Sequence, residues 1–148
     1  MQDTLIRIQS LPHVHHFDDY EVIELPMTSE DRRRVRRRLT ADDGQAFALE
    51  LPTGTTLHVG HALHAQDDKA YVVTAAPEEV LVVSPKDIEE AAFVGHLIGN
   101  LHRDIDIQEG QVIALWNMPL EKRLEKEGLD AERTQRPFRG KPPGEHSH

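Results

Sequence analysis

Histidine is the residue type in this chain best suited to chemistry, and two histidines lie close together near residue 100. The segment from His96 to His102 reads HLIGNLH, so two imidazoles flank a Gly-Asn pair. The chain has ten histidines and no cysteine. A transition metal would therefore be held by nitrogen and oxygen ligands, because no thiolate exists to bind it. Such ligands suit exchangeable Ni(II), Cu(II) or Zn(II).

His102 is the residue at which a metal site can be built most simply. His96 and His102 are six positions apart, which places them on different faces of a continuous helix. A lone surface imidazole binds a divalent metal weakly, but a twofold axis beside His102 would bring in a second copy of it. We therefore predict a homodimer that creates the site. The structural alternative is that His96 is a half-buried helix residue and His102 begins a strand with its ring bonded to backbone.

His146 and His148 are candidate additional ligands on the C-terminal tail. They are separated by one serine in a segment rich in proline and glycine, which predicts a flexible tail over residues 139–148. Two imidazoles on such a tail could swing onto a metal already anchored at the dimer axis. The alternative is that they form a solvated end without function.

Two further histidine clusters are weaker candidates. The HVHH segment lies in an apparent loop and could form an accessory metal patch, although such a cluster is more often simply an exposed polar loop. The HVGHALH segment repeats histidine every three residues, but in the strand and turn that we predict there this spacing does not converge on one point. The two clusters contain His13, His15 and His16, and His58, His61 and His64.

Six arginines between Arg32 and Arg38 form the one dense basic patch of the sequence. On a strand they would project cations from both faces. A nucleic-acid-binding arm is one interpretation, but the net charge of -9 and an aromatic content of 5% argue against it. Docking onto an acidic protein partner, or a solvated strand face, fits better.

Composition also limits the compartment and the partners. Residues 1–10 lack the basic start and continuous apolar core of a signal peptide. No segment approaches the roughly 20 apolar residues that span a bilayer. We expect a cytoplasmic protein that binds neither membrane nor nucleic acid.

The first half of the chain reads as a small all-β domain over residues 1–75. Alternating or β-branched segments predict its strands, and Asp42-Asp43-Gly44 predicts a turn between two of them. The predicted strands cover residues 4–8, 20–25, 45–51, 57–63 and 69–75.

The second half, residues 76–138, reads as a ferredoxin-like βαββαβ domain, which makes the fold class α+β. Ser84 is predicted to cap a helix, and Gly99-Asn100 to end it in the left-handed conformation just before His102. A second helix is predicted over residues 119–127. The predicted strands cover residues 80–83, 103–107, 111–116 and 131–138.

These residues resemble the urease accessory protein E family of nickel metallochaperones. Gly99-Asn100-Leu101-His102 is similar to the family's Gly-Asn-Arg-His signature, with leucine in place of arginine, and His96 precedes it as in many members. The resemblance extends over nearly the whole chain. Further matching segments are Arg34 to Leu39, Asp42-Asp43-Gly44, Leu51-Pro52-Thr53-Gly54 with Leu57, Gly60 and Leu63, and Leu120-Glu121-Lys122.

The resemblance implies a nickel-binding metallochaperone that delivers Ni(II) during assembly of the urease active site. It implies a peptide-binding-like N-terminal domain and a C-terminal domain that dimerises around His102 as primary ligand, with His146 and His148 as tail ligands. Zn(II) or Cu(II) could bind the same site. The implied partners are a second copy, other urease accessory proteins including a GTPase, and the urease apoprotein.

The sequence departs from the family pattern at several positions. No long polyhistidine tail is present, so bulk nickel storage is not expected, and His61 stands where the family usually has aspartate. Three other functions remain open. They are a metalloenzyme that uses His96, His102 and Asp104, a structural zinc dimer, and a metal-free peptide-binding adaptor.

Overall fold

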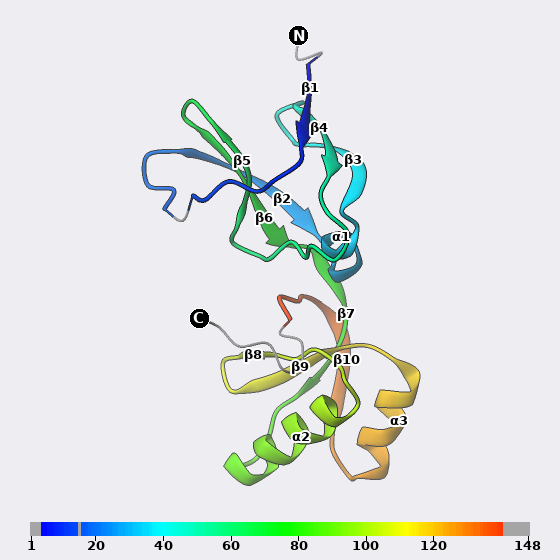
Figure 1. The fold of residues 1–148 in the computed structure, drawn as a ribbon. Helices are drawn as coiled ribbons and strands as arrows, with labels where there is room; N and C mark the ends of the chain where they lie inside the picture. The colour runs from blue at the N-terminus through cyan, green and yellow to red at the C-terminus, as the bar shows by residue number, and fades with distance from the viewer. Residues whose placement is uncertain (1–3, 15, 141–148) are drawn as a thin grey trace. The chain divides into compact units, whose positions relative to one another are not determined.

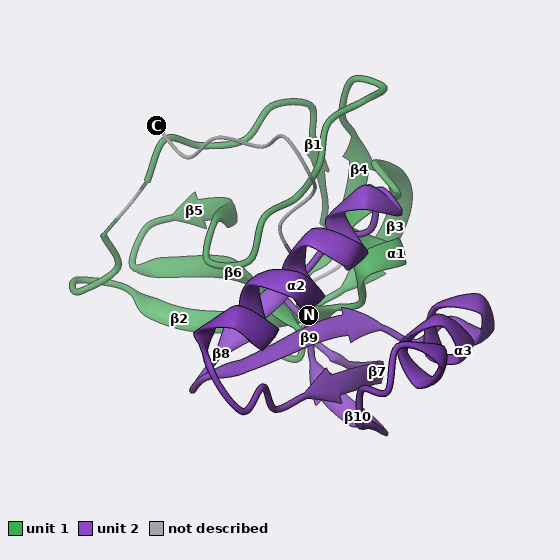
Figure 2. Cartoon of the chain, turned by 90° about the horizontal axis from the view of Figure 1, so that it is seen from below, with its two compact units in different colours: residues 1–75 green, residues 76–148 purple. Residues whose placement is uncertain are grey.

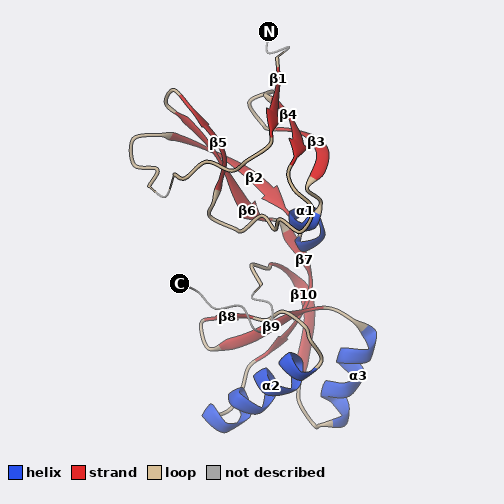
Figure 3. Ribbon diagram, viewed as in Figure 1, coloured by secondary structure: helices blue, strands red, loops and turns tan. Residues whose placement is uncertain are grey.

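The computed structural model describes residues 4–14 and 16–140, and its fold is mixed α+β, as the sequence predicts (Figure 1). The chain divides into two compact units, residues 1–75 and 76–148 (Figure 2). Strands predominate in the first unit, and the two longer helices belong to the second (Figure 3). None of the helices in the described residues combines the length and apolar character needed to cross a bilayer.

The first unit contains two three-stranded sheets with the same mixed arrangement. In each, the central strand pairs with one parallel and one antiparallel neighbour, in the orders β1-β4-β3 and β2-β6-β5. The strands are β1 (Leu5–Ile8), β2 (Glu21–Met27), β3 (Arg36–Thr40), β4 (Ala46–Glu50), β5 (Ala62–Gln66) and β6 (Lys69–Ala75).

Both sheets contribute to one hydrophobic core. Phe47 of β4 is fully buried, and its ring meets that of Tyr71 of β6 edge to face at 4.9 Å between centroids. Leu25 of β2 and Val73 of β6, both in the second sheet, belong to the same buried cluster. The period of two in these strands therefore directs alternate side chains into a shared interior.

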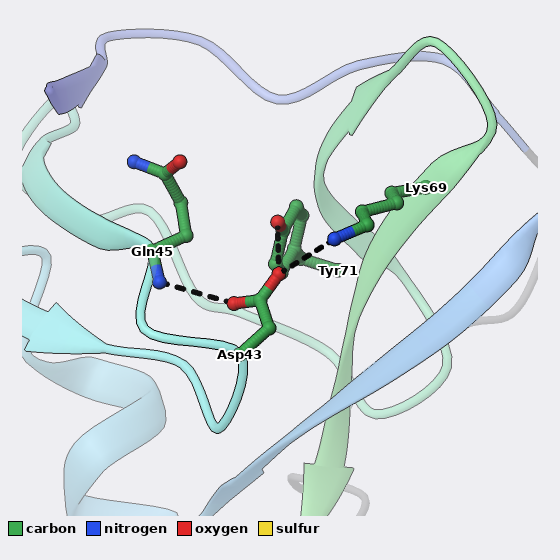
Figure 4. Close-up of polar contacts among 4 residues, drawn as sticks. All are labelled: Asp43, Gln45, Lys69 and Tyr71. Atoms are coloured by element: carbon green, nitrogen blue, oxygen red, sulfur yellow. Dashed lines mark hydrogen bonds and ion pairs between the residues drawn. The ribbon is translucent and has the colours of Figure 1, made fainter. Parts of the chain in front are cut away.

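A polar network joins the β3–β4 turn to β6 (Figure 4). Asp43 accepts hydrogen bonds from the Tyr71 hydroxyl at 2.6 Å and the Lys69 ammonium at 3.4 Å, while its other oxygen accepts from the Gln45 backbone at 3.0 Å. Burial tends to raise the pKa of Asp43, but the hydrogen bonds from Tyr71 and Gln45 outweigh it and lower this pKa. Burial, followed by the bond to Asp43, raises the pKa of Tyr71 to about 12.

The all-β prediction for the first half is wrong at one short helix, α1 (Ser29–Arg33). Thr28 and Asp31 form a capping box, each side chain bonding to the other's backbone N–H. The six arginines do not share one strand: two lie at the end of α1 and three lie in β3. Arg32 is 4% exposed and donates to the Met27 carbonyl at 2.6 Å, so it is a structural residue rather than part of a solvated patch.

The segment from residue 57 to 63 also differs from the prediction. Only its last two residues enter a strand, because β5 begins at Ala62. Leu57 is buried, and its N–H donates to the Arg32 carbonyl at 3.0 Å. The residues between Leu57 and Ala62 form a turn.

The second unit has the element order β-α-β-β-α-β around an antiparallel sheet of order β10-β7-β9-β8. This order places its last strand beside its first. The elements are β7 (Pro77–Val83), α2 (Ile88–Asn100), β8 (Asp106–Gln108), β9 (Gln111–Leu115), α3 (Met118–Lys126) and β10 (Ala131–Pro137).

Both faces of this sheet are covered. Leu81 and Val83 of β7 pack in one cluster with residues of α2 and α3, while Val80 and Val82 pack with Phe138 in another. Successive strand side chains point to opposite faces, so this division explains why four consecutive residues of β7 are buried.

The start of α2 differs from the prediction. Asp87, not Ser84, is the N-cap, and its carboxylate accepts from the Glu90 N–H at 2.8 Å. The Ser84 hydroxyl accepts from the Gln111 side chain instead. The helix therefore begins at Ile88.

Candidate metal centre

His102 occupies the turn that ends α2. The N–H of His102 donates to the Gly99 carbonyl at 2.9 Å, and the N–H of Arg103 donates to the Ile98 carbonyl at 3.3 Å. These two bonds form a Schellman motif, in which the residue after the C-cap adopts the left-handed conformation. Leu101 is the C-cap, and His102 has φ +57°. The imidazole is thus carried on a sharp turn with a defined backbone.

The left-handed residue is not the one that the sequence predicts. Gly99 and Asn100 have the residue types that tolerate positive φ, yet both lie within α2. Histidine at positive φ is uncommon, and a left-handed conformation costs an ordinary L-residue about 1–2 kcal/mol relative to the right-handed one. The turn would be more stable with glycine at position 102. Backbone strain of this kind is concentrated at functional sites, which marks His102 as a residue to test.

His96 and His102 are both solvent-exposed. His96 lies on the outer side of α2 together with Phe93 and Asn100, at the i, i+3 and i+7 spacing of one helix face. The structural alternative of a half-buried His96 is therefore wrong. His102 does not begin a strand either, because β8 starts only at Asp106.

Exposed apolar side chains accompany these imidazoles. Phe93 and Leu101 are each 43% exposed, although the neighbouring Val94, Leu97 and Ile98 are buried against the sheet. Leu101 also removes the charge that the resemblance predicts at this position. The surface beside His102 is therefore partly apolar.

The described residues of one chain do not complete a metal site. No group of three or more histidine, aspartate or glutamate side chains within residues 4–14 and 16–140 is placed to hold a metal ion. The constellation of His96, His102 and Asp104 is thus not assembled. The predicted tail ligands His146 and His148, and His15 of the loop cluster, lie outside the described residues.

Comparison with known proteins identifies the family. The family model described as "UreE urease accessory protein, N-terminal domain" matches residues 6–76. A urease accessory protein UreE of Synechococcus sp. is 53% identical over 129 residues, which cover 86% of each chain. The chain belongs to the UreE family. UreE of Deinococcus radiodurans is 47% identical over 84% of this chain and 80% of its own. A third UreE, from Geobacillus kaustophilus, is 27% identical over 90% of this chain and 88% of its own.

Membership of the UreE family establishes the class of function. The chain is a urease accessory protein and not an enzyme. This excludes the metalloenzyme interpretation, in agreement with the dispersed positions of its three candidate ligands. The family model ends at residue 76, so it covers the first unit and does not include His102. His102 therefore stands as a candidate on its exposure and its left-handed backbone, which it shares with Asp67 and Glu109.

Proposed function

We propose that this UreE chain carries Ni(II) as cargo and delivers it during assembly of the urease active site. The observation that carries the proposal is an exposed imidazole at a position where the backbone favours glycine. Imidazole nitrogen is a good ligand for Ni(II). Left-handed backbone at non-glycine residues is concentrated at functional sites, and metal binding is a role that an exposed imidazole can fill.

The second unit, in this proposal, is a ferredoxin-like domain that pairs with a second copy around His102. Its strand order and βαββαβ sequence of elements support that fold. A twofold axis beside the end of α2 would bring two His102 side chains together and would also cover the exposed Phe93 and Leu101. One dimer would then hold one ion between two chains.

We expect additional ligands to complete the coordination shell of the ion at His102. In this proposal His146 and His148 of the tail bind the ion held by the His102 pair, and His96, which lies on α2, is a further candidate ligand. Zn(II) or Cu(II) can bind the same nitrogens. Because Cu(II) binds such ligands at least as tightly as Ni(II), nickel identity would come from metal availability and partner docking rather than from affinity.

The proposed partners are other urease accessory proteins, including a GTPase, and the urease apoprotein, in the cytoplasm. The net charge of -9 is unsuited to nucleic acid, which is not a proposed partner. No membrane partner is proposed either. The arginines of β3 provide a local positive surface to which an acidic protein segment could dock.

Calorimetric titration with Ni(II) tests the proposal when the oligomeric state is measured in the same samples. We expect His102→Ala to lower the affinity for Ni(II) at least about tenfold, because each dimer loses two nitrogen ligands. The matched control is His64→Ala, which removes an imidazole already bonded to Gln66 in the first unit. A chain ending at Gly144 should still bind through His102, but more weakly. Full affinity in His102→Ala would refute the site assignment.

A further inference from the structure

The first unit contains a second pair of histidines that the sequence does not predict to meet. The rings of His58 and His61 have centroids 5.5 Å apart, with 60° between their planes. Both residues are solvent-exposed. The expectation that the HVGHALH spacing cannot converge is therefore wrong for this pair. His64 lies apart from it, with its ring 5.8 Å from Phe47 and its Nε2 bonded to Gln66.

A tight turn brings the two rings together. The His61 N–H donates to the His58 carbonyl at 3.2 Å, which closes a four-residue β-turn. Gly60, the third residue of that turn, has φ +94°. Positive φ at this position is the mark of a type II turn and explains the glycine. Positions i and i+3 of such a turn lie side by side, whereas on a strand they would point to opposite faces.

Hydrogen bonds to β6 hold the turn in place. The Gly60 N–H donates to the Val73 carbonyl at 2.8 Å, and the Val73 N–H donates to the His61 carbonyl at 2.9 Å. Val73 is 1% exposed, so the turn is attached to the core of the unit. The backbone that carries both imidazoles is therefore ordered before any ligand binds, which reduces the entropy lost on binding.

We propose that His58 and His61 form a second, exchangeable site for a late transition metal ion, separate from His102. Metal–nitrogen bonds of about 2.0–2.1 Å place an imidazole centroid about 3 Å from the ion, so two rings on one ion have centroids about 5 Å apart. The observed separation is close to this value. Metal binding requires one nitrogen of each ring to turn toward the ion.

The number of protein ligands determines how readily this site releases its ion. Within the described part of the chain no group of three or more histidine or carboxylate side chains is placed to hold a metal ion, so the proposed site has two protein ligands, His58 and His61. A site with two protein ligands and bound water releases its ion readily, which suits transfer rather than storage. Cu(II) binds imidazole more tightly than Ni(II), so Cu(II) is the more sensitive probe.

Nuclear magnetic resonance with Cu(II) tests this site independently of the first. The protein is the full-length chain with His102→Ala, His146→Ala and His148→Ala, so failure of the proposed nickel site does not affect the result. Paramagnetic Cu(II) broadens the signals of nearby amides. We expect the Val59, Gly60 and His61 amides to broaden at up to two equivalents of Cu(II).

Variants of the pair decide between chelation and binding to one ring. His58→Asn and His61→Asn should each weaken the Cu(II)-dependent broadening at Gly60 at least about tenfold, because the second ligand of a chelate acts at high effective concentration. His64→Asn is the matched control and should leave it unchanged. Broadening at Gly60 that survives either substitution, or that is absent at two equivalents in the parent protein, overturns the proposal.

Discussion

At the scale of single residues, His102 combines an exposed ligand with an unfavourable backbone conformation. Replacing it with glycine should leave the free energy of unfolding of the second unit unchanged or raise it by up to about 1 kcal/mol, because relief of the left-handed strain offsets the larger chain entropy of unfolded glycine. The same change should lower the affinity for Ni(II) at least about tenfold, as in His102→Ala. Trp116 is the only tryptophan and lies in the second unit, so its fluorescence during urea unfolding measures this stability.

His102→Ala is the control for that comparison, since it removes the imidazole but keeps a Cβ at positive φ. It should show the same loss of Ni(II) affinity without gaining stability. A loss of more than about 1 kcal/mol in His102→Gly would mean that the histidine side chain stabilises the turn, contrary to the strain argument.

Tyr71 gives a second residue-scale prediction, for high pH. Its pKa in the folded protein is about 12, above the ordinary value of 10. The protonated hydroxyl therefore contributes stability that is fully present below pH 10 and is lost as the pH rises through about 12. In a Tyr20→Phe chain, whose one remaining tyrosine is Tyr71, ultraviolet absorbance should report a midpoint near 12. Asp43→Asn should lower that midpoint, and a midpoint of 10 in the parent chain would show that the network does not form.

The residue types revealed the candidate ligands. They did not reveal the backbone conformation of these residues or which side chains lie beside them. The Gly99-Asn100 pair suggests where a left-handed residue belongs, yet the Schellman bonds place it at His102. The choice depends on which turn lets the chain continue toward β8, and this is a tertiary effect. The pairing of His58 with His61 was detectable in principle, because Val59-Gly60 has the residue types of a type II turn.

At the scale of elements, Phe138 is the side chain that closes the sheet face opposite the helices. It is fully buried with Val80, Val82 and Ile113. Phe138→Ala should destabilise the second unit by about 3–5 kcal/mol through lost burial and a cavity. The fluorescence of Trp116 during urea unfolding measures this loss.

Ile88 provides the control for Phe138, because it is 84% exposed on α2. Ile88→Ala should change the free energy of unfolding by no more than about 0.5 kcal/mol. Equal effects of the two substitutions would contradict the assignment of Phe138 to the core.

Strands with a clear alternating pattern could be predicted from the sequence. Short elements, and those whose conformation depends on tertiary contacts, could not. The strands near residues 20–25, 45–51 and 69–75 correspond to β2, β4 and β6. Helix α1 has five residues, too few to show a periodic pattern, and the Thr28 to Asp31 capping box is its one local signal. The strand expected at residues 57–63 is replaced by a turn whose backbone bonds to β6.

At the scale of the whole molecule, each unit has hydrophobic cores built from apolar side chains of its own. A carrier should therefore stay folded when its cargo is removed, whereas a structural zinc protein depends on its metal for folding. After dialysis against a chelator, circular dichroism and Trp116 fluorescence should retain their folded signals at 25 °C. Unfolding on metal removal would favour the structural zinc alternative.

The central claim is that two chains together hold one Ni(II) ion through their His102 side chains. Anomalous X-ray diffraction at the nickel edge, from crystals grown with Ni(II), measures the position of the ion directly. We expect a nickel peak on a twofold axis, within about 2.0–2.1 Å of an imidazole nitrogen of His102 from each chain. Crystals in which nickel is bound elsewhere and no nickel lies at His102 would contradict it.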